Sequence, residues 1–154
     1  MVAYQPTPAR HILDFIRRTK LTERDVFIDL GSGLGHVPLL ISICTNARTI
    51  GIELEPAYVH CARQSADDLR LRNATFLSVD ARDADLSSGS VFYLYTPFRG
   101  AMLRTVLDRL LAEATTRAIR VCTFGPCTSI VATEPWLALD PTESGHISVF
   151  RSHK

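Results

Sequence analysis

The chain has 154 residues, a length that suits a continuous hydrophobic core and predicts one domain over 1–154. Its 46% hydrophobic and 21% charged residues are typical of a soluble globular protein and exclude extended disorder. The net charge of +1 creates no strong field, so there is no strong nucleic-acid signal and no signal for an anionic membrane as partner.

The first predicted element is a helix over residues 8–20. Ile12 and Ile16 keep helical spacing, and Pro8 is tolerated in a first helical turn because its missing N–H would have no partner there. A buried strand over 26–30 follows, since this run is mostly apolar and short.

A glycine-rich turn separates that strand from a helix over about 34–45, whose Pro38 belongs in the first turn. A second strand is expected over 48–53. Pro56 begins the next helix, and a third strand is expected over 74–79. The chain thus alternates between strands and helices, as in folds with a parallel sheet.

The run 91–95 is apolar at every position, which is typical of a central parallel strand covered on both faces. A helix around 103–111 and a strand over 118–124 continue the alternation. The pattern then changes, because only a short or irregular crossover fits before two strands over 136–139 and 146–150. The residues between these two strands are turn formers, so the end of the chain is predicted to be an antiparallel hairpin.

One stretch indicates a ligand site more clearly than any other, and it reads Asp29-Leu30-Gly31-Ser32-Gly33-Leu34-Gly35. Glycines adopt backbone angles closed to other residues and let a ligand approach main-chain N–H groups. A dinucleotide fingerprint would need a small residue at position 36, where this chain has His36. An ordinary turn between strand and helix is the alternative reading.

The spacing D-x-G-x-G-x-G resembles the first motif of the class I methyltransferases that use S-adenosylmethionine. The resemblance implies that Asp29 helps to bind the amino acid end of the cofactor, and that Gly31, Ser32, Gly33 and Gly35 lie against it. It also implies an α/β fold with a Rossmann-like seven-strand sheet in the order 3-2-1-4-5-7-6, which agrees with five β/α units followed by a C-terminal antiparallel hairpin.

Further cofactor contacts are expected where the next strands end, because ligands of doubly wound sheets bind at the carboxyl ends of strands. Glu53 ends the second strand, where an acidic side chain can accept hydrogen bonds from both ribose hydroxyls; a surface glutamate is the alternative. Leu54 would cover an apolar face of the cofactor. Asp80 resembles the acid that receives the adenine amino group, with Ala81 supplying a main-chain N–H, and a turn cap is the alternative for Asp80.

The predicted acceptor site follows the fourth strand, in the sequence Tyr95-Thr96-Pro97-Phe98. It resembles the (N/D/S)-P-P-(Y/F) motif of amino-directed methyltransferases at Pro97 and Phe98 and departs from it at Tyr95 and Thr96. A threonine hydroxyl and exposed carbonyl groups can orient an amine, and the Phe98 ring offers a face for a cation. The alternative is that Phe98 only covers the core where the next helix begins.

A narrower resemblance adds the N-terminal segment. Three features together resemble one branch of the class I methyltransferases, which contains two known groups. These features are the glycine motif, the sequence Gly51-Ile52-Glu53, and Tyr4 with Thr7 ahead of the first helix. The two groups are the disruptor-of-telomeric-silencing histone lysine methyltransferases and the mitochondrial lysine methyltransferases of ATP synthase subunit c. The resemblance implies that residues 1–20 close over the cofactor, with Tyr4 or Thr7 meeting its carboxylate.

The four cysteines lack the paired C-x-x-C spacing of a zinc site, so reduced thiols in a cytoplasmic protein without a bound metal are expected. No signal peptide opens the chain, and no apolar run reaches the ~18 residues that would predict membrane insertion. The sequence therefore predicts an S-adenosylmethionine-dependent N-methyltransferase of a protein or small-molecule amine, with no oligomeric state indicated. A small-molecule methyltransferase and a non-catalytic cofactor-binding fragment are the alternatives.

Overall fold

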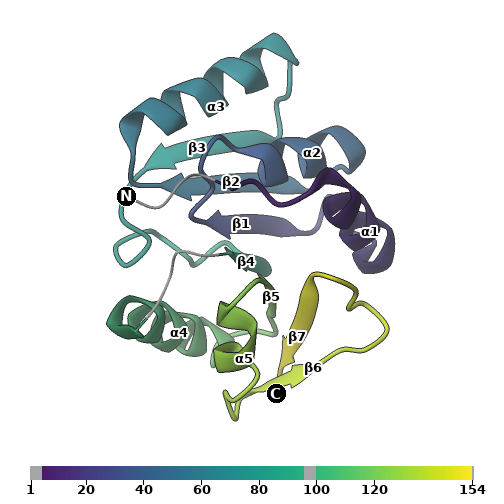
Figure 1. Cartoon of the computed structure of the whole chain (residues 1–154), viewed down its shortest axis with the longest axis vertical. Coiled ribbons are helices and arrows are strands. Elements are labelled where there is room, and N and C mark those ends of the chain that lie inside the picture. Colours follow the sequence, from purple (N-terminus) through teal and green to yellow (C-terminus); the bar gives the residue numbers. More distant parts are fainter. Residues whose placement is uncertain (1–4, 96–99, 154) are drawn as a thin grey trace.

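A computed structural model describes residues 5–95 and 100–153. The described chain forms a seven-stranded sheet in the order β3-β2-β1-β4-β5-β7-β6, which confirms the predicted topology (Figure 1). Strands and helices alternate as expected, with these bounds: α1 Ala9–Thr19, β1 Val26–Leu30, α2 His36–Cys44, β2 Arg48–Glu53, α3 Pro56–Asp68, β3 Ala74–Ser78, β4 Val91–Tyr95, α4 Gly100–Ala114, β5 Arg120–Phe124, α5 Cys127–Val131, β6 Leu137–Leu139 and β7 Ser148–Ser152.

The two faces of the sheet are covered by different helices. On one face, Ile28 of β1 and Phe92 of β4 pack with the apolar sides of α4 and α5. On the other face, Phe27 of β1 packs with α1 and α2, and Phe76 of β3 packs with α2 and α3. The central strands are therefore buried on both sides, which explains why β4 is apolar at every position and β1 at every position except Asp29.

A row of residues in register crosses the sheet on the face covered by α1 to α3. Asp29 of β1 lies between Gly51 of β2 and Tyr93 of β4, while Phe76 and Cys122 continue the row on β3 and β5. Directly opposed residues of parallel strands project to the same face of a sheet. The row therefore places an acidic residue and a phenol side by side inside the protein.

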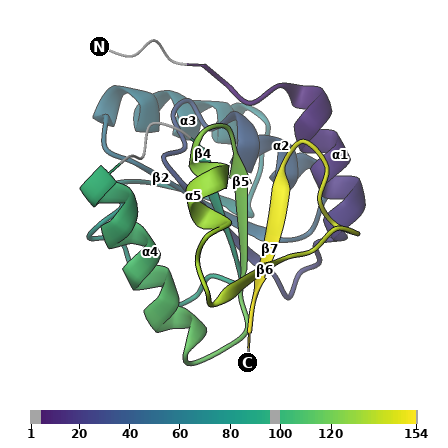
Figure 2. The same ribbon diagram turned by 60° about the horizontal axis from the view of Figure 1, so that its bottom comes forward.

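The C-terminal hairpin differs in one detail from the expectation. The last strand begins at Ser148 and ends at Ser152, so the predicted range 146–150 was wrong by two residues. The cause is a longer turn: the Gly145 N–H donates to the Ile147 carbonyl, and the Val149 N–H donates to the Ser144 hydroxyl. Figure 2 shows how this turn extends from β7 toward α1.

A network of charged side chains joins the hairpin to the start of the sheet. Arg120 of β5 donates to Glu143 of the turn at 3.0 Å, to Asp25 before β1 at 3.2 Å, and to the carbonyl of Thr19 at 3.3 Å. Both Arg120 and Glu143 are largely buried. One guanidinium thus fixes three segments that are far apart in the sequence.

The described residues contain neither a membrane-spanning helix nor a cluster of metal ligands. None of their helices combines the length and the hydropathy that a membrane-spanning helix needs. No group of three or more histidine, cysteine or acidic side chains among them is arranged to hold a metal ion.

Candidate functional site

The carboxyl ends of the central strands meet at one edge of the sheet. Leu30, the last residue of β1, lies in register with Ile52 of β2, and Glu53 follows at the end of β2. Tyr95 ends β4 opposite Phe124, which ends β5. The glycine turn after β1 therefore opens at the same edge as the ends of the neighbouring strands, where doubly wound sheets bind their ligands.

The glycine turn has the backbone that its sequence predicts. Gly31, Gly33 and Gly35 have φ values of 106°, 56° and 87°, which residues with a side chain rarely adopt. A Cβ atom at Gly35 would also lie 2.8 Å from the ring of Phe76. The N–H groups of Gly31 and Ser32 both donate to the Ile52 carbonyl, at 2.8 and 2.9 Å. These bonds hold the turn against the end of β2.

Glu53 is bonded directly to the glycine turn. One carboxylate oxygen accepts the Gly33 N–H at 2.9 Å, and the other accepts the Glu55 N–H at 2.9 Å. Each oxygen keeps a further lone pair for a ligand. Glu53 is half-buried and bonded to the glycine turn, and its contact with a ribose stays a prediction.

Asp29 and Ser32 bring buried polar atoms to the site that have no hydrogen-bond partner among the described residues. These atoms are Asp29 Oδ1 and the Ser32 hydroxyl oxygen, and both side chains are at most 5% exposed. Burial, and secondly the charge of Glu53, raise the pKa of Asp29 well above its ordinary value. Buried polar groups normally have partners, so these two atoms are places where a ligand could supply a donor or a cation.

Asp80 lies after β3 and is paired with Arg82. Its carboxylate accepts the Arg82 main-chain N–H at 2.9 Å and two guanidinium N–H groups at 3.0 and 2.7 Å. The turn cap considered for Asp80 is thus present, and its contact with adenine stays a prediction. Ala81 is buried, and its carbonyl accepts a bond from Arg109. Leu54, in contrast, is 62% exposed, which leaves its side chain free to cover a ligand.

We expect the Asp80–Arg82 pair to affect stability in acid. The hydrogen bonds from the Arg82 side chain lower the pKa of Asp80 to about 2, below its ordinary value of 3.8. The pair therefore stabilises the fold above about pH 4, and this contribution is lost as the pH falls toward 2. Because Arg82 is half exposed and water screens the pair, replacing it should cost little stability.

Urea unfolding between pH 2 and 6 tests this expectation. Arg82→Met should make the free energy of unfolding fall less steeply between pH 4 and 2 than in the wild type, and Asp80→Asn should do the same. Parallel curves for the wild type and both variants would show that the pair has no part in acid stability.

Of the remaining predicted site residues, two belong to the described part of the chain and four lie outside it. Thr7 is buried, and its hydroxyl forms a 2.7 Å hydrogen bond with the Tyr93 phenol, so its contact with a cofactor carboxylate stays a prediction. The ring of Tyr95 lies 5.2 Å from that of Phe124, between the ends of two strands. Outside the described residues lie Tyr4, Thr96, Pro97 and Phe98.

Sequence reasoning missed groups that the fold brings to this edge. The apolar run 91–95 predicts a buried strand and no separate role for Tyr93, although a buried tyrosine hydroxyl usually needs a hydrogen-bond partner. His11 of α1 stacks on His146 of the hairpin turn with ring centres 4.0 Å apart, and it also lies 5.5 Å from Phe124. Burial and the charge of His146 lower the pKa of His11.

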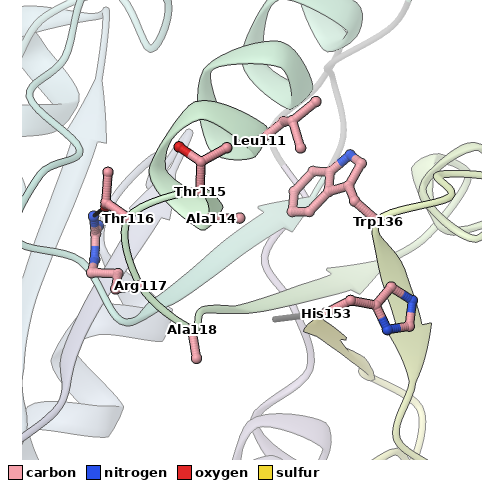
Figure 3. Close-up of a pocket in the computed structure, with 8 residues that line it drawn as sticks. All are labelled: Leu111, Ala114, Thr115, Thr116, Arg117, Ala118, Trp136 and His153. Carbon is pink, nitrogen blue, oxygen red and sulfur yellow. Dashed lines mark hydrogen bonds between the residues drawn. The ribbon is translucent and has the colours of Figure 1, made fainter.

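A groove of about 480 Å³ lies elsewhere, at the end of α4 and the start of β5 (Figure 3). Leu111, Ala114 and Trp136 give it an apolar wall, with His153 at its side. It lies at the amino end of β5, opposite the edge with the glycine turn, and its lining contains no carboxylate. It is therefore separate from the candidate site.

Comparison with known protein families gives one match over more than half of the chain. Residues 2–93 match the family model described as histone methylation protein DOT1. Over 74 residues the chain is 36% identical to the H3 lysine-79 specific histone-lysine N-methyltransferase of Cryptococcus neoformans var. neoformans serotype D. The aligned segment is 48% of this chain and 12% of that enzyme, so the chain spans a small part of the length of this relative.

Solved structures share the fold along almost the whole chain. The RNA methyltransferase from Salinibacter ruber in complex with S-adenosyl-L-homocysteine has a TM-score of 0.68 at 23% identity, covering 96% of this chain and 92% of that one. Precorrin-6y C5,15-methyltransferase from Geobacter metallireducens has a TM-score of 0.67 at 19% identity, with 97% and 90% covered. At such identities these likenesses show the fold alone.

Proposed function

We propose that this chain, which belongs to the histone methylation protein DOT1 family, is an S-adenosylmethionine-dependent methyltransferase that methylates an amine nitrogen. The observation that carries the proposal is the buried Asp29 Oδ1, which has no partner among the described residues and lies next to a turn of three glycines with positive φ. An ammonium group of a ligand is the donor that such an oxygen needs.

The residues at this edge fit the cofactor group by group. Asp29 would accept from the α-ammonium group of its methionine part, and the same positive charge would oppose the raised pKa of this carboxyl. The free lone pairs of Glu53 suit the two ribose hydroxyls, and the exposed Leu54 side chain suits the apolar face of adenine. When bound, the cofactor supplies a methyl group made electrophilic by a sulfonium.

The chain itself needs little acid-base chemistry for such a transfer. Its task is to hold the acceptor nitrogen in line with the methyl group in a dry site. A lysine acceptor has a pKa of about 10.4 in water and must lose a proton first, and desolvation by the rings of Tyr95 and Phe124 favours the neutral amine. Thr96, Pro97 and Phe98 would complete this acceptor site.

A protein lysine is the proposed acceptor. The curated relative that aligns with 48% of this chain is named for methylation of a histone lysine, and the family carries the same description. The net charge of +1 provides no extended basic region, so we do not assign a nucleosome as the substrate. A cytoplasmic location is part of the proposal, and it is supported by the four cysteines, which are all free thiols in the structure.

Two measurements test the proposal. Calorimetry of the purified chain should show binding of S-adenosylhomocysteine and none of NAD. Mass spectrometry after incubation with S-adenosylmethionine should then show addition of a methyl group to lysine peptides, and a panel of small amines provides the comparison. Transfer only to small amines would make the chain a small-molecule methyltransferase, and binding without transfer to any acceptor would make it a cofactor-binding protein. Absence of binding would refute the proposal.

A further inference from the structure

Tyr93 joins the N-terminal segment to the candidate cofactor site. It lies on β4 directly beside Asp29 of β1, in the register of the two parallel strands. Its side chain is 1% exposed, and its ring lies 6.1 Å from that of Phe27, which is on the face covered by α1 and α2. The phenol therefore projects to the same face as the Asp29 carboxyl, inside the core and not toward solvent.

The hydroxyl of Tyr93 has its partner on a segment distant in sequence. It forms a 2.7 Å hydrogen bond with the Thr7 hydroxyl, and Thr7 is itself 4% exposed. Thr7 stands two residues before α1, so this bond fixes the segment that leads into the helix. Burial raises the pKa of Tyr93, and the charge of Asp29 adds to this, so the phenol keeps its proton over the working pH range.

We propose that Tyr93 is a positioning residue for cofactor binding. Its hydroxyl holds Thr7, in the described residues 5–8 before α1, beside Asp29, so that these residues and the Asp29 carboxylate contact one ligand together. The inference rests on the proposed function, because that ligand is the cofactor. Thr7 then acts through Tyr93, whether or not it also touches the cofactor. A bond that served only stability would not affect the affinity for a ligand at Asp29.

A second buried hydroxyl pair in the same fold provides a matched control. Thr49 of β2 and Ser42 of α2 share a 2.7 Å hydrogen bond, and both residues are buried. This bond lies near the start of β2 and the end of α2, away from the glycine turn. Thr49→Val removes a hydroxyl of the same kind from a comparable environment, without touching the row that contains Asp29.

The test measures the dissociation constant of S-adenosylhomocysteine by calorimetry and the stability of each variant by urea unfolding. Tyr93→Phe and Thr7→Val should each weaken binding roughly three- to tenfold, the range expected for one net hydrogen bond. The double variant should be no weaker than either single variant, because both lose the same interaction. Thr7→Ser keeps the hydroxyl and should restore the affinity. Thr49→Val should lower stability and leave the dissociation constant unchanged.

Two results would overturn the role of Tyr93, and a third would overturn the proposed function on which that role rests. Wild-type affinity in Tyr93→Phe and Thr7→Val, with stability lowered as in Thr49→Val, would make the bond a purely structural one. Additive losses in the double variant would show that the two hydroxyls act independently. If the wild-type chain bound no S-adenosylhomocysteine, the proposed function itself would fail, and this is measured before any variant is compared.

Discussion

Gly33→Val is expected to reduce the affinity for S-adenosylhomocysteine, measured by calorimetry, by more than about a hundredfold. Gly33 has a φ of 56° and donates its N–H to Glu53 at 2.9 Å. A β-branched residue is strongly disfavoured at such a φ, so the turn must change its backbone and lose this bond. The new side chain would also occupy the space where a ligand approaches the main chain.

A second glycine variant is needed to distinguish the effect of backbone strain on stability from the loss of the ligand site in Gly33→Val. Gly100 has a φ of 53°, and a Cβ atom there would have no atom within 4 Å, so Gly100→Val carries the same strain outside the glycine turn. It should lose stability and still bind. Leu107→Ala, which empties part of the core, should cost about 2 to 5 kcal/mol and more stability than Gly33→Val. Near-normal affinity in Gly33→Val would show that the ligand does not contact this turn.

Glu53→Ala is expected to weaken binding about ten- to hundredfold. A hydrogen bond to a charged group contributes roughly 1.5 to 3 kcal/mol, and this carboxylate is the proposed acceptor for the ribose. The variant also frees the N–H groups of Gly33 and Glu55 that the carboxylate holds. Glu53→Gln keeps one acceptor oxygen and should fall between Glu53→Ala and the wild type.

Glu55→Ala is the matched control for this prediction. Glu55 lies two residues after Glu53 and is the N-cap of α3, where its carboxylate accepts the Ala57 N–H at 3.2 Å. Glu55→Ala therefore removes one negative charge and one helix cap but leaves Glu53 in place. Calorimetry should show wild-type affinity for Glu55→Ala together with a modest loss of stability. An unchanged dissociation constant in Glu53→Ala would remove Glu53 from the site.

Local patterns in the sequence were enough to predict most of the fold. Strands β1 and β4 are short and mostly apolar runs, and glycines, prolines or polar loops separate the strands from the helices. The last strand was misplaced because Ile147 is apolar and buried like a strand residue, while its carbonyl in fact closes a turn with Gly145. Hydrophobicity alone does not distinguish a buried residue in a strand from a buried residue in a turn.

The candidate site was predictable where its groups lie within one motif or at strand ends. The sequence indicates Asp29 and the glycine turn through their resemblance to a known motif, and Glu53 through its place at the end of a strand. The pairing of Asp80 with Arg82 could not be predicted, because Arg82 is one of many dispersed arginines. The Thr7–Tyr93 bond and the stacked pair of His11 and His146 join segments from distant parts of the chain. Only tertiary packing creates such contacts, and no local pattern indicates them.

The contacts of Arg120 also have a consequence for the order of folding. Its guanidinium joins the end of α1, the residue before β1 and the turn that leads to β7, so the first and last parts of the chain share one buried cation. Such non-local contacts raise the contact order, and closing a long loop costs entropy before the contacts form. The network around Arg120 is therefore complete only when the turn before β7 has docked against the end of α1 and the start of β1.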